Sequence, residues 1–389
     1  MPGLEKEIVI LSAARTPFGK FCGALKDLSA TELGIIAGRA AVERAGVHPE
    51  EIDHVTFGNA QQTSTDAIYL ARHIGLKIGV PPSVPALTVN RICGSGFQSI
   101  VSGAQLLLLG EANFVLAGGT ENMSQAPHVI RGARSGIPLG EGRLEDSLWS
   151  ALTDTYCNLN MAETAENLAR EYGITREEAD DFAYQSQMRT KSAQEASRLS
   201  QEIVPIGGLL DRDEHPRAST TREALAALKP VFRKDGIVTA GNASGISDGA
   251  AAVILSTSEK AHQRGIQPLA RIVSWGIAGC EPAIMGIGPV PAIRMALDRV
   301  RLALNELDLI EVNEAFACQY LAVEKELGLD RVKVNVNGGA IAIGHPLGAT
   351  GTRLTTTLIY ELKRRNARYG LGSACIGGGQ GIALLIERI

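Results

Sequence analysis

The stretch "ALTVNRICGSGFQSIVSGAQLLLLGEANFVLAGGTE", residues 86–121, decides the fold. A short apolar run ends at residue 90, a helical pattern begins in small residues at 94–96, and a second apolar run ends in glycines near residue 119. Strands and helices that alternate at this length predict an α/β core whose helices cover both faces of the sheet. Cys93 stands at the junction, where the first strand gives way to the helix.

The same series surrounds this stretch. Upstream, "EIVILSAA" (7–14), "ATELGIIAGRAAVERAG" (30–46) and "DHVTFGN" (53–59) are typical of a strand, an amphipathic helix and a strand. The C-terminal third repeats the pattern, with Asn59 matching Asn313, Asn90 matching Asn337 and Gly118 matching Gly377 at offsets of 254, 247 and 259. These matches predict two copies of one core rather than a short-period solenoid. The alternative to a duplication is that these matches reflect only the general similarity of α/β chains.

Between the copies the composition changes. Residues 120–246 carry helical patterns and polar connectors that contain Pro and Gly, such as "LLDRDEHPRAST" (209–220). Thr175, with Glu178 three residues later, makes a capping box that marks a helix start. We therefore predict an N-terminal core of 1–119 and 247–272, an inserted loop domain of 120–246, and a C-terminal core of 273–389. Insertions on such cores commonly shape access to a substrate.

The overall composition excludes several function classes. The chain of 389 residues has 38 basic and 42 acidic side chains and no basic block, so no nucleic-acid partner is expected. No apolar run approaches the roughly 18 residues of a membrane helix, so no membrane span is expected. Six scattered cysteines and a short start before the first strand favour a reducing, cytoplasmic location. The seven histidines show no zinc spacing, so no metal is predicted.

Four segments stand at predicted strand ends, where ligands gather in α/β sheets. At Cys93, the start of a helix offers free N–H groups and favours a thiolate, although inert packing is the alternative. His345, held before Pro346 at another helix entrance, is the natural base for a cysteine, although a structural role is common. Cys375 opens onto three glycines whose N–H groups suit an oxyanion, unless they form a plain turn. Asn313 is either functional or a helix cap.

Two other motifs lack the context that their chemistry needs. "GISDG" (245–249) fits G-x-S-x-G, but it follows a loop and not a strand, so a serine nucleophile is not expected. No Walker A sequence is present, and "GSGFQS" lacks the last glycine of the dinucleotide fingerprint.

Four motifs together resemble one family over essentially the whole chain. "NRICGSGFQS" (90–99), "VNEAFA" (312–317), "NGGAIAIGHPLGATG" (337–351) and "CIGGGQGIA" (375–383) resemble, in order, the signature blocks of the thiolases. "DAIYLARHIGL" (66–76), "LEDSLWSALTD" (144–154) and "MAETAENLA" (161–169) are similar to the mitochondrial 3-ketoacyl-CoA thiolases more than to biosynthetic acetoacetyl-CoA enzymes. Asn160 departs from the histidine typical of the biosynthetic enzymes.

The resemblance implies a fold and an activity. The fold would be a five-layer α-β-α-β-α sandwich of two similar halves plus a loop domain that holds coenzyme A, in a homodimer or homotetramer. The activity would be the reversible cleavage of 3-ketoacyl-CoA by coenzyme A to acetyl-CoA and a shortened acyl-CoA in fatty acid β-oxidation. Coenzyme A would be a co-substrate, with no tightly bound cofactor. The alternative functions are an acetoacetyl-CoA thiolase, a non-cleaving acyl-CoA carrier or a cysteine hydrolase. The alternative location is the mitochondrial matrix.

The resemblance also implies residue roles. Cys93 would be the acylated nucleophile, His345 its base and Cys375 the second acid/base. Asn313 and His345 would hold a water in one oxyanion hole, and the N–H groups of Cys93 and Gly377 would form the other. The positions similar to coenzyme A contacts are Arg217, Thr220 and Ser244, with Leu152, Met161, Phe232, Ala240, Met285, Ala315 and Phe316 as apolar walls.

Overall fold

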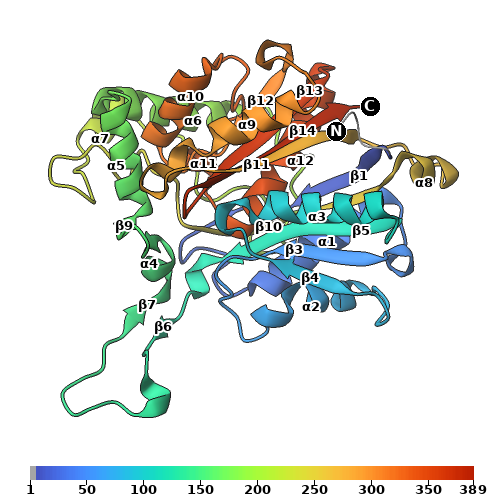
Figure 1. The fold of residues 1–389 in the computed structure, drawn as a ribbon, viewed down its shortest axis with the longest axis horizontal. Helices are drawn as coiled ribbons and strands as arrows, with labels where there is room; N and C mark the ends of the chain where they lie inside the picture. The colour runs from blue at the N-terminus through green and yellow to red at the C-terminus, as the bar shows by residue number, and fades with distance from the viewer. Residues whose placement is uncertain (1–5) are drawn as a thin grey trace.

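The computed structural model describes residues 6–389, and its main strands form one extended mixed sheet (Figure 1). The first group is, in spatial order, β4 (Ala86–Val89), β3 (His54–Gly58), β5 (Phe114–Asn122), β10 (Ser247–Thr257) and β1 (Ile8–Arg15), with β2 (Gly19–Lys20) beside β10. The second group continues from β1 as β11 (Ala270–Gly279), β14 (Gln380–Arg388), β13 (Tyr369–Ile376) and β12 (Leu309–Val312). The groups join where Ile8–Ile10 of β1 pair with β11.

Both groups have the same strand directions. In the first, β3 lies parallel to β5, and β5 lies antiparallel to β10. In the second, β12 lies parallel to β13, and β13 lies antiparallel to β14. The duplicated core that the sequence predicts is therefore present as two halves of one topology.

Helices cover the two halves in three layers, which completes the α-β-α-β-α order. On the outer side of the first half lie α1 (Ala30–Ala45) and α2 (Leu70–Ile78), and on that of the second lie α9 (Pro289–Asp298) and α10 (Ala317–Leu327). Between the halves lie α3 (Ser95–Leu109) and α12 (Leu347–Arg365), which contact strands of both. Because both faces of this middle layer are covered, these helices bury apolar side chains in several directions.

The middle layer contains a segment more apolar than we expected. Ile92–Leu109 is long and apolar enough to cross a membrane by length and composition alone, contrary to the expectation that no segment approaches that length. In this structure 56% of that segment is buried, as in the core helix of a folded protein.

The two middle helices begin in direct contact, and glycines make this possible. A Cβ atom added to Gly96 in α3 would lie 2.6 Å from the Thr352 nitrogen in α12, and one on Gly119 of β5 would lie 1.9 Å from the Gly348 oxygen of α12. Neither separation is compatible with a side chain. The small residues at the two helix starts therefore bring the ends of the two halves together.

The inserted segment lies at one end of the sheet. The short strands β6 (His128–Val129) and β7 (Glu145–Asp146) lead into a loop that extends away from both halves in Figure 1. The remaining elements are α4 (Ser147–Ala151), β8 (Thr153–Asp154), β9 (Leu159–Asn160), α5 (Met161–Glu171), α6 (Arg176–Glu195) and α7 (Arg222–Ala226). Two short helices of the cores complete the chain, α8 (Ser258–Gln263) and α11 (Ala340–Ile343).

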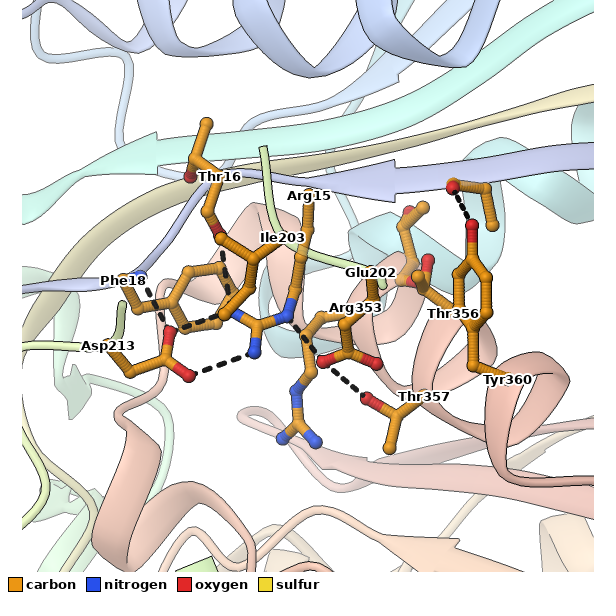
Figure 2. Close-up of polar contacts among 12 residues, drawn as sticks. Arg15, Thr16, Phe18, Glu202, Ile203, Asp213, Arg353, Thr356, Thr357 and Tyr360 are labelled. Carbon is orange, nitrogen blue, oxygen red and sulfur yellow. Dashed lines mark hydrogen bonds and ion pairs between the residues drawn. The ribbon is translucent and has the colours of Figure 1, made fainter. Parts of the chain in front are cut away.

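A buried ion-pair cluster ties the insertion to the first half (Figure 2). Arg15, at the end of β1, donates to Glu202 at 2.6 Å and to both oxygens of Asp213 at 2.6 and 2.8 Å. Thr357 of α12 donates to the same Glu202 at 3.3 Å. Removing one member of this buried cluster would leave an uncompensated charge, so its members are held together. The cluster thereby holds residues 202–213 against β1 of the first half and α12 of the second.

The capping box at Thr175 is confirmed. Its hydroxyl accepts from the Glu178 nitrogen at 3.2 Å, the Glu178 carboxylate accepts from the Thr175 nitrogen at 2.7 Å, and α6 begins at Arg176. The predicted division into 1–119 with 247–272, 120–246 and 273–389 stays a prediction; the boundary at 272 lies inside β11.

One match of the repeat is wrong. In the parallel pairs, Gly58 lies opposite Gly119 and Val312 lies opposite Ser373, so matching Asn59 to Asn313 places Gly118 opposite Gly372 and not Gly377. The residue that matches Cys375 is then Glu121. Glycine-rich strand ends had suggested the wrong register, since composition does not count hydrogen-bonded pairs.

Candidate active site

Cys93 and His345 occupy equivalent places in the two halves. Cys93 lies two residues before the start of α3 and His345 two residues before the start of α12. Both are nearly buried, at 9% and 5% exposure, and Cys93 packs against Leu347, the first residue of α12. The two helix starts therefore bring a thiol and an imidazole to one place, as their positions in the repeat predict.

The backbone before each residue is left-handed. Gly344 has a φ of 106°, which glycine adopts without cost, whereas Ile92 has a φ of 46°. A β-branched residue rarely takes this conformation, and such strain costs about 1–3 kcal/mol. Ile92 is held by Asn90, whose side chain accepts from the Ile92 nitrogen at 2.9 Å. Strain of this kind persists where the surroundings fix the position of a functional group, which here is Cys93.

The sulfur of Cys93 lies at converging N–H groups, but its proton is held more tightly than we expected. The backbone N–H groups of Gly377 and of Cys93 itself point at the sulfur and favour the thiolate. Burial has the larger effect and raises the pKa of the Cys93 thiol to about 12. The N–H groups act in the expected direction, but the expected net lowering of the Cys93 pKa is not found in the free protein, because two hydrogen bonds do not replace the water that a thiolate loses.

The hydrogen bonds of His345 define which ring nitrogen is free. The Thr350 hydroxyl donates to the Pro346 carbonyl at 3.0 Å and lies 2.6 Å from Nδ1, so it accepts the Nδ1 proton. Nε2 is therefore unprotonated, and it accepts a hydrogen bond from Nδ2 of Asn313 at 3.3 Å. This tautomer presents the lone pair that a general base needs.

His345 stays neutral in the folded protein. Burial and, to a smaller extent, the positive charge of Arg353 lower the pKa of His345 to about 3. Arg353 is fully buried, its closest charged partner is Glu311 at 3.4 Å, and its Nε and Nη2 atoms have no partner. A buried cation with little compensation disfavours a second positive charge nearby.

This lowered pKa predicts a pH-dependent stability. The unfolded chain binds a proton at His345 near pH 6.5 and the folded chain only near pH 3, so the contribution of the neutral ring is complete above pH 6.5 and is lost as the pH falls. Relative to His345→Gln, the wild type should lose about 2 kcal/mol of unfolding free energy between pH 7 and pH 5. Urea unfolding of both proteins at each pH measures this difference.

Comparing the two proteins removes the contributions of other groups that titrate in this range. Burial raises the pKa of Glu121 to about 7 and of Glu311 to about 8, and both are present in the wild type and in the variant. An equal loss of stability in both proteins between pH 7 and pH 5 would contradict the assignment of a neutral, buried His345.

Cys375 and Asn313 complete the site from the ends of β13 and β12. Both are fully buried, and burial together with the nearby sulfurs of Cys93 and Cys280 raises the pKa of Cys375 well above its ordinary value. Asn313 donates its main-chain N–H to the Ser373 oxygen at 2.9 Å, which ties the two strand ends together. Its Oδ1 atom is buried without a partner. A water or substrate oxygen is the ordinary partner for such an atom.

The predicted coenzyme A positions fall into separate groups. Most of the predicted apolar walls gather around the cysteines: Leu152 packs in the cluster of Cys93, and Met161, Met285, Ala315 and Phe316 pack in that of Cys375. The polar and outer positions are looser: Arg217 and Thr220 share an exposed turn, Ser244 donates to the Ala315 oxygen at 2.9 Å, Phe232 stacks on Trp149, and Ala240 is exposed.

The turn of Arg217 is tied to the base through the chain around it. His215 lies 2.9 Å from the Ala342 oxygen, and the His345 nitrogen donates to the Gly245 oxygen at 3.0 Å. A Cβ atom on Gly245 would lie 2.0 Å from the His215 ring, so this glycine allows the close contact. Through these contacts the exposed turn is connected to the loop before His345. The Arg217 nitrogen itself donates to the Gln187 side chain and not to either cysteine.

Within residues 6–389, no group of three or more His, Cys, Asp or Glu side chains is arranged to hold a metal ion. The predicted absence of a metal stays a prediction.

Two residues of the site were missed from the sequence. Thr350 sets the histidine tautomer, and Glu121 accepts from the Gly348 nitrogen at 2.9 Å in the first turn of α12. A hydroxyl in the first turns of the helix after His345 was the available signal for Thr350. Glu121 could have been found in the sequence only from the correct register of the repeat, which matches it to Cys375.

Both halves of the chain match models of one family. Residues 8–259 match the model described as "Thiolase, N-terminal domain", and residues 266–388 match "Thiolase, C-terminal domain". The chain belongs to the thiolase family.

Its relatives make the placement more specific. The mitochondrial 3-ketoacyl-CoA thiolase of Homo sapiens is 54% identical over 99% of both chains, and the acetyl-CoA acetyltransferase of Cupriavidus necator is 48% identical over 98% of this chain and 99% of its own. The crystal structure of human mitochondrial 3-ketoacyl-CoA thiolase in complex with CoA superposes with a TM-score of 0.99, covering 100% of this chain and 99% of that one.

Proposed function

We propose that this protein is a 3-ketoacyl-CoA thiolase, which uses coenzyme A as a co-substrate to cleave 3-ketoacyl-CoA into acetyl-CoA and a shortened acyl-CoA. The observation that carries the proposal is the convergence of Cys93, Cys375 and the Asn313–His345 pair at the ends of two duplicated halves. The names of the human relative and of its complex with CoA support the same substrate class.

The first half of the reaction uses both cysteines. The Cys93 sulfur attacks the 3-keto carbon while its proton passes to the unprotonated Nε2 of His345, which gives up the hydrogen bond that it accepts from Asn313. The bond between C2 and C3 then breaks, the acyl group stays on Cys93 as a thioester, and the electron pair leaves on the acetyl-CoA enolate. Cys375 donates its proton to C2 and completes acetyl-CoA.

The second half restores the enzyme. Cys375, now a thiolate, takes the proton of an incoming coenzyme A thiol, and the coenzyme A sulfur attacks the thioester on Cys93. The acyl group leaves on coenzyme A, and the proton on His345 returns to Cys93. The N–H groups of Cys93 and Gly377 at one position, and a water held by Asn313 and His345 at the other, are proposed to stabilise the two oxyanions.

The high pKa of Cys93 explains why the reaction needs a base such as His345. With the thiol pKa raised to about 12, very little thiolate exists near neutral pH, so the proton must leave as the sulfur attacks. An unprotonated Nε2 of His345 at the neighbouring helix start meets this need.

The preferred substrate is proposed to be a 3-ketoacyl-CoA longer than acetoacetyl-CoA. An apolar cluster of Met123, Leu148 and Leu347 adjoins Cys93, and Ala126 and Leu152 pack against it. Asn160 is nearly buried and uses its side chain to cap α5 through the Ala162 nitrogen at 3.1 Å. The alternative is acetyl-CoA C-acetyltransferase activity, favoured by the similarity to the Cupriavidus necator enzyme.

A substrate comparison tests both proposals. We expect 3-ketoacyl-CoA substrates of C8 to C16 to be cleaved with a kcat/KM about tenfold or more above that of acetoacetyl-CoA, because each buried methylene adds about 0.8 kcal/mol of binding. Loss of the Mg²⁺-enolate absorbance with and without coenzyme A follows the reaction.

The outcomes separate the functions. No consumption of any substrate would overturn the thiolase proposal, and consumption without coenzyme A would support a hydrolase. A preference for acetoacetyl-CoA would keep the thiolase chemistry and support the acetyltransferase.

Other features of the biology are proposals of the same kind. The name of the human relative says mitochondrial, which supports the matrix for this chain, while the cytoplasm stays the prediction from the sequence. A place in fatty acid β-oxidation follows from the proposed substrate, and a homodimer or homotetramer stays a prediction.

A further inference from the structure

Glu121 occupies in the first half the place that Cys375 occupies in the second. Glu121 lies two residues beyond Gly119, the partner of Gly58, and Cys375 lies two beyond Ser373, the partner of Val312. Each faces a glycine on the neighbouring antiparallel strand, Gly249 for Glu121 and Gly381 for Cys375. The duplication therefore places a carboxyl group where the other half has the proposed acid/base thiol.

The asparagines of the repeat continue this correspondence. Asn313 follows β12 and points its Nδ2 at His345, whereas Asn59 follows β3 and donates its Nδ2 to Glu121 at 2.8 Å. In both residues Oδ1 is buried without a partner. The first half thus retains the asparagine and replaces the thiol with a group that its neighbours satisfy.

The carboxylate of Glu121 is fully buried and fully hydrogen bonded. One oxygen accepts from Asn59 at 2.8 Å and from the Gln61 nitrogen at 3.1 Å, and the other accepts from the Ala60 nitrogen at 3.0 Å and from Gly348 at 2.9 Å. The last bond crosses from β5 to the first turn of α12, three residues after His345. The carboxylate lies at the positive end of that helix, where a negative charge is stabilised.

The charge of Glu121 also acts on the nucleophile. Besides burial, the groups that influence Cys93 are the N–H groups of Gly377 and of Cys93 itself, which favour its thiolate, and the carboxyl of Glu121 on β5; Cys93 in turn influences the thiol of Cys375 on β13. Glu121 makes the thiolate less favourable and is itself influenced by Asp248 on β10. Because burial raises the pKa of Glu121 only to about 7, the carboxylate is charged at the mildly alkaline pH of a thiolysis assay.

We propose that Glu121 is a positioning residue for thiolysis: its bond to Gly348 holds the first turn of α12, and with it His345, against Cys93, and its charge adds to burial in keeping the Cys93 proton on sulfur until substrate is attacked. The role rests on the proposed function of the site. It assigns a task to a residue that touches neither substrate nor reacting atoms.

The test separates positioning from stability through two measurements. Alkylation of Cys93 by iodoacetamide in the free protein, followed on the Cys93 peptide by mass spectrometry, needs no turnover. In Glu121→Gln we expect alkylation at pH 8 to be about 3- to 10-fold faster, as the loss of a neighbouring negative charge shifts a thiol by about half to one pKa unit. We expect kcat to fall about 30- to 100-fold with KM for coenzyme A within about threefold, since a misplaced base slows the chemical step.

The pH profile carries a second signature. In the wild type, the logarithm of the alkylation rate should rise with a slope below one near pH 7, because ionisation of Glu121 opposes that of Cys93. In Glu121→Gln the slope should be one throughout. Glu121→Asp, which keeps the charge, should return the alkylation profile towards the wild type and recover part of kcat.

Glu361→Gln is the matched control. Glu361 is a nearly buried glutamate near the other end of α12, paired with Arg364 and Arg365. Glu361→Gln should lose stability without a change in the alkylation profile of Cys93 or in kcat. If the alkylation profile of Glu121→Gln follows the wild type, the inference is overturned while thiolase activity stands; if the wild-type protein has no thiolase activity, the proposed function fails independently.

Discussion

Cys93→Ser is expected to lower kcat for thiolysis by about four orders of magnitude or more, the usual scale for loss of a covalent nucleophile. Serine differs by one atom, so the packing against Leu347 and Met123 is kept. An alkoxide is far harder to form than a thiolate, and the pKa of His345, lowered to about 3, makes the ring a base that acts only in step with attack. Steady-state thiolysis and intact-mass detection of the acyl adduct measure the two effects.

Cys318→Ser is the control for the Cys93 variant. Cys318 is also a buried cysteine, but it lies in α10, and its sulfur donates to the Ala165 oxygen at 3.4 Å. This variant should keep its kcat and its acyl adduct while losing some stability. Full turnover by Cys93→Ser, or an adduct on another residue, would refute the assignment of the nucleophile.

Cys375→Ala is expected to separate the two cysteines. Overall thiolysis should fall about 1000-fold or more, since general acid–base catalysis contributes about 10²- to 10⁴-fold and both halves of the reaction use this thiol. Acyl transfer from acyl-CoA to Cys93 should be slower but still detectable by mass, because coenzyme A can leave as a thiolate and take its proton from solvent. Exchange of the acetyl methyl protons of acetyl-CoA with deuterium should collapse.

Cys280→Ala provides the comparison for that exchange. Cys280 lies close enough to influence the pKa of Cys375, and its sulfur faces the Met285 oxygen at 3.8 Å. Removing it leaves the proposed acid/base in place, so exchange should continue. Unchanged exchange in Cys375→Ala would show that another group moves the proton.

The order of motifs along the chain predicted the fold and the principal residues of the site. The repeat placed Cys93 and His345 at equivalent helix starts, and the structure has both there. The capping box at Thr175 was also predicted correctly, because a cap depends on residues three positions apart. The match of Gly118 to Gly377 was wrong, since hydrogen-bonded register sets such a match and glycine content does not.

The sequence by itself determined which chemical groups are available and which secondary structures carry them. Periodicity, small residues at helix starts and the duplicated pattern are local properties, so they are visible without a structure. Only the tertiary structure decided how those groups are protonated. Burial raises the pKa of Cys93 to about 12 although its helix start predicts the opposite, and Thr350 leaves Nε2 of His345 unprotonated. The role of Glu121 likewise depends on Gly348, which lies 227 positions away in the sequence and donates its N–H to the Glu121 carboxylate. Desolvation and long-range hydrogen bonds arise from chain segments that are distant in sequence, so the stretch around Cys93 predicted a nucleophile, and only the packed halves show how its proton is held and removed.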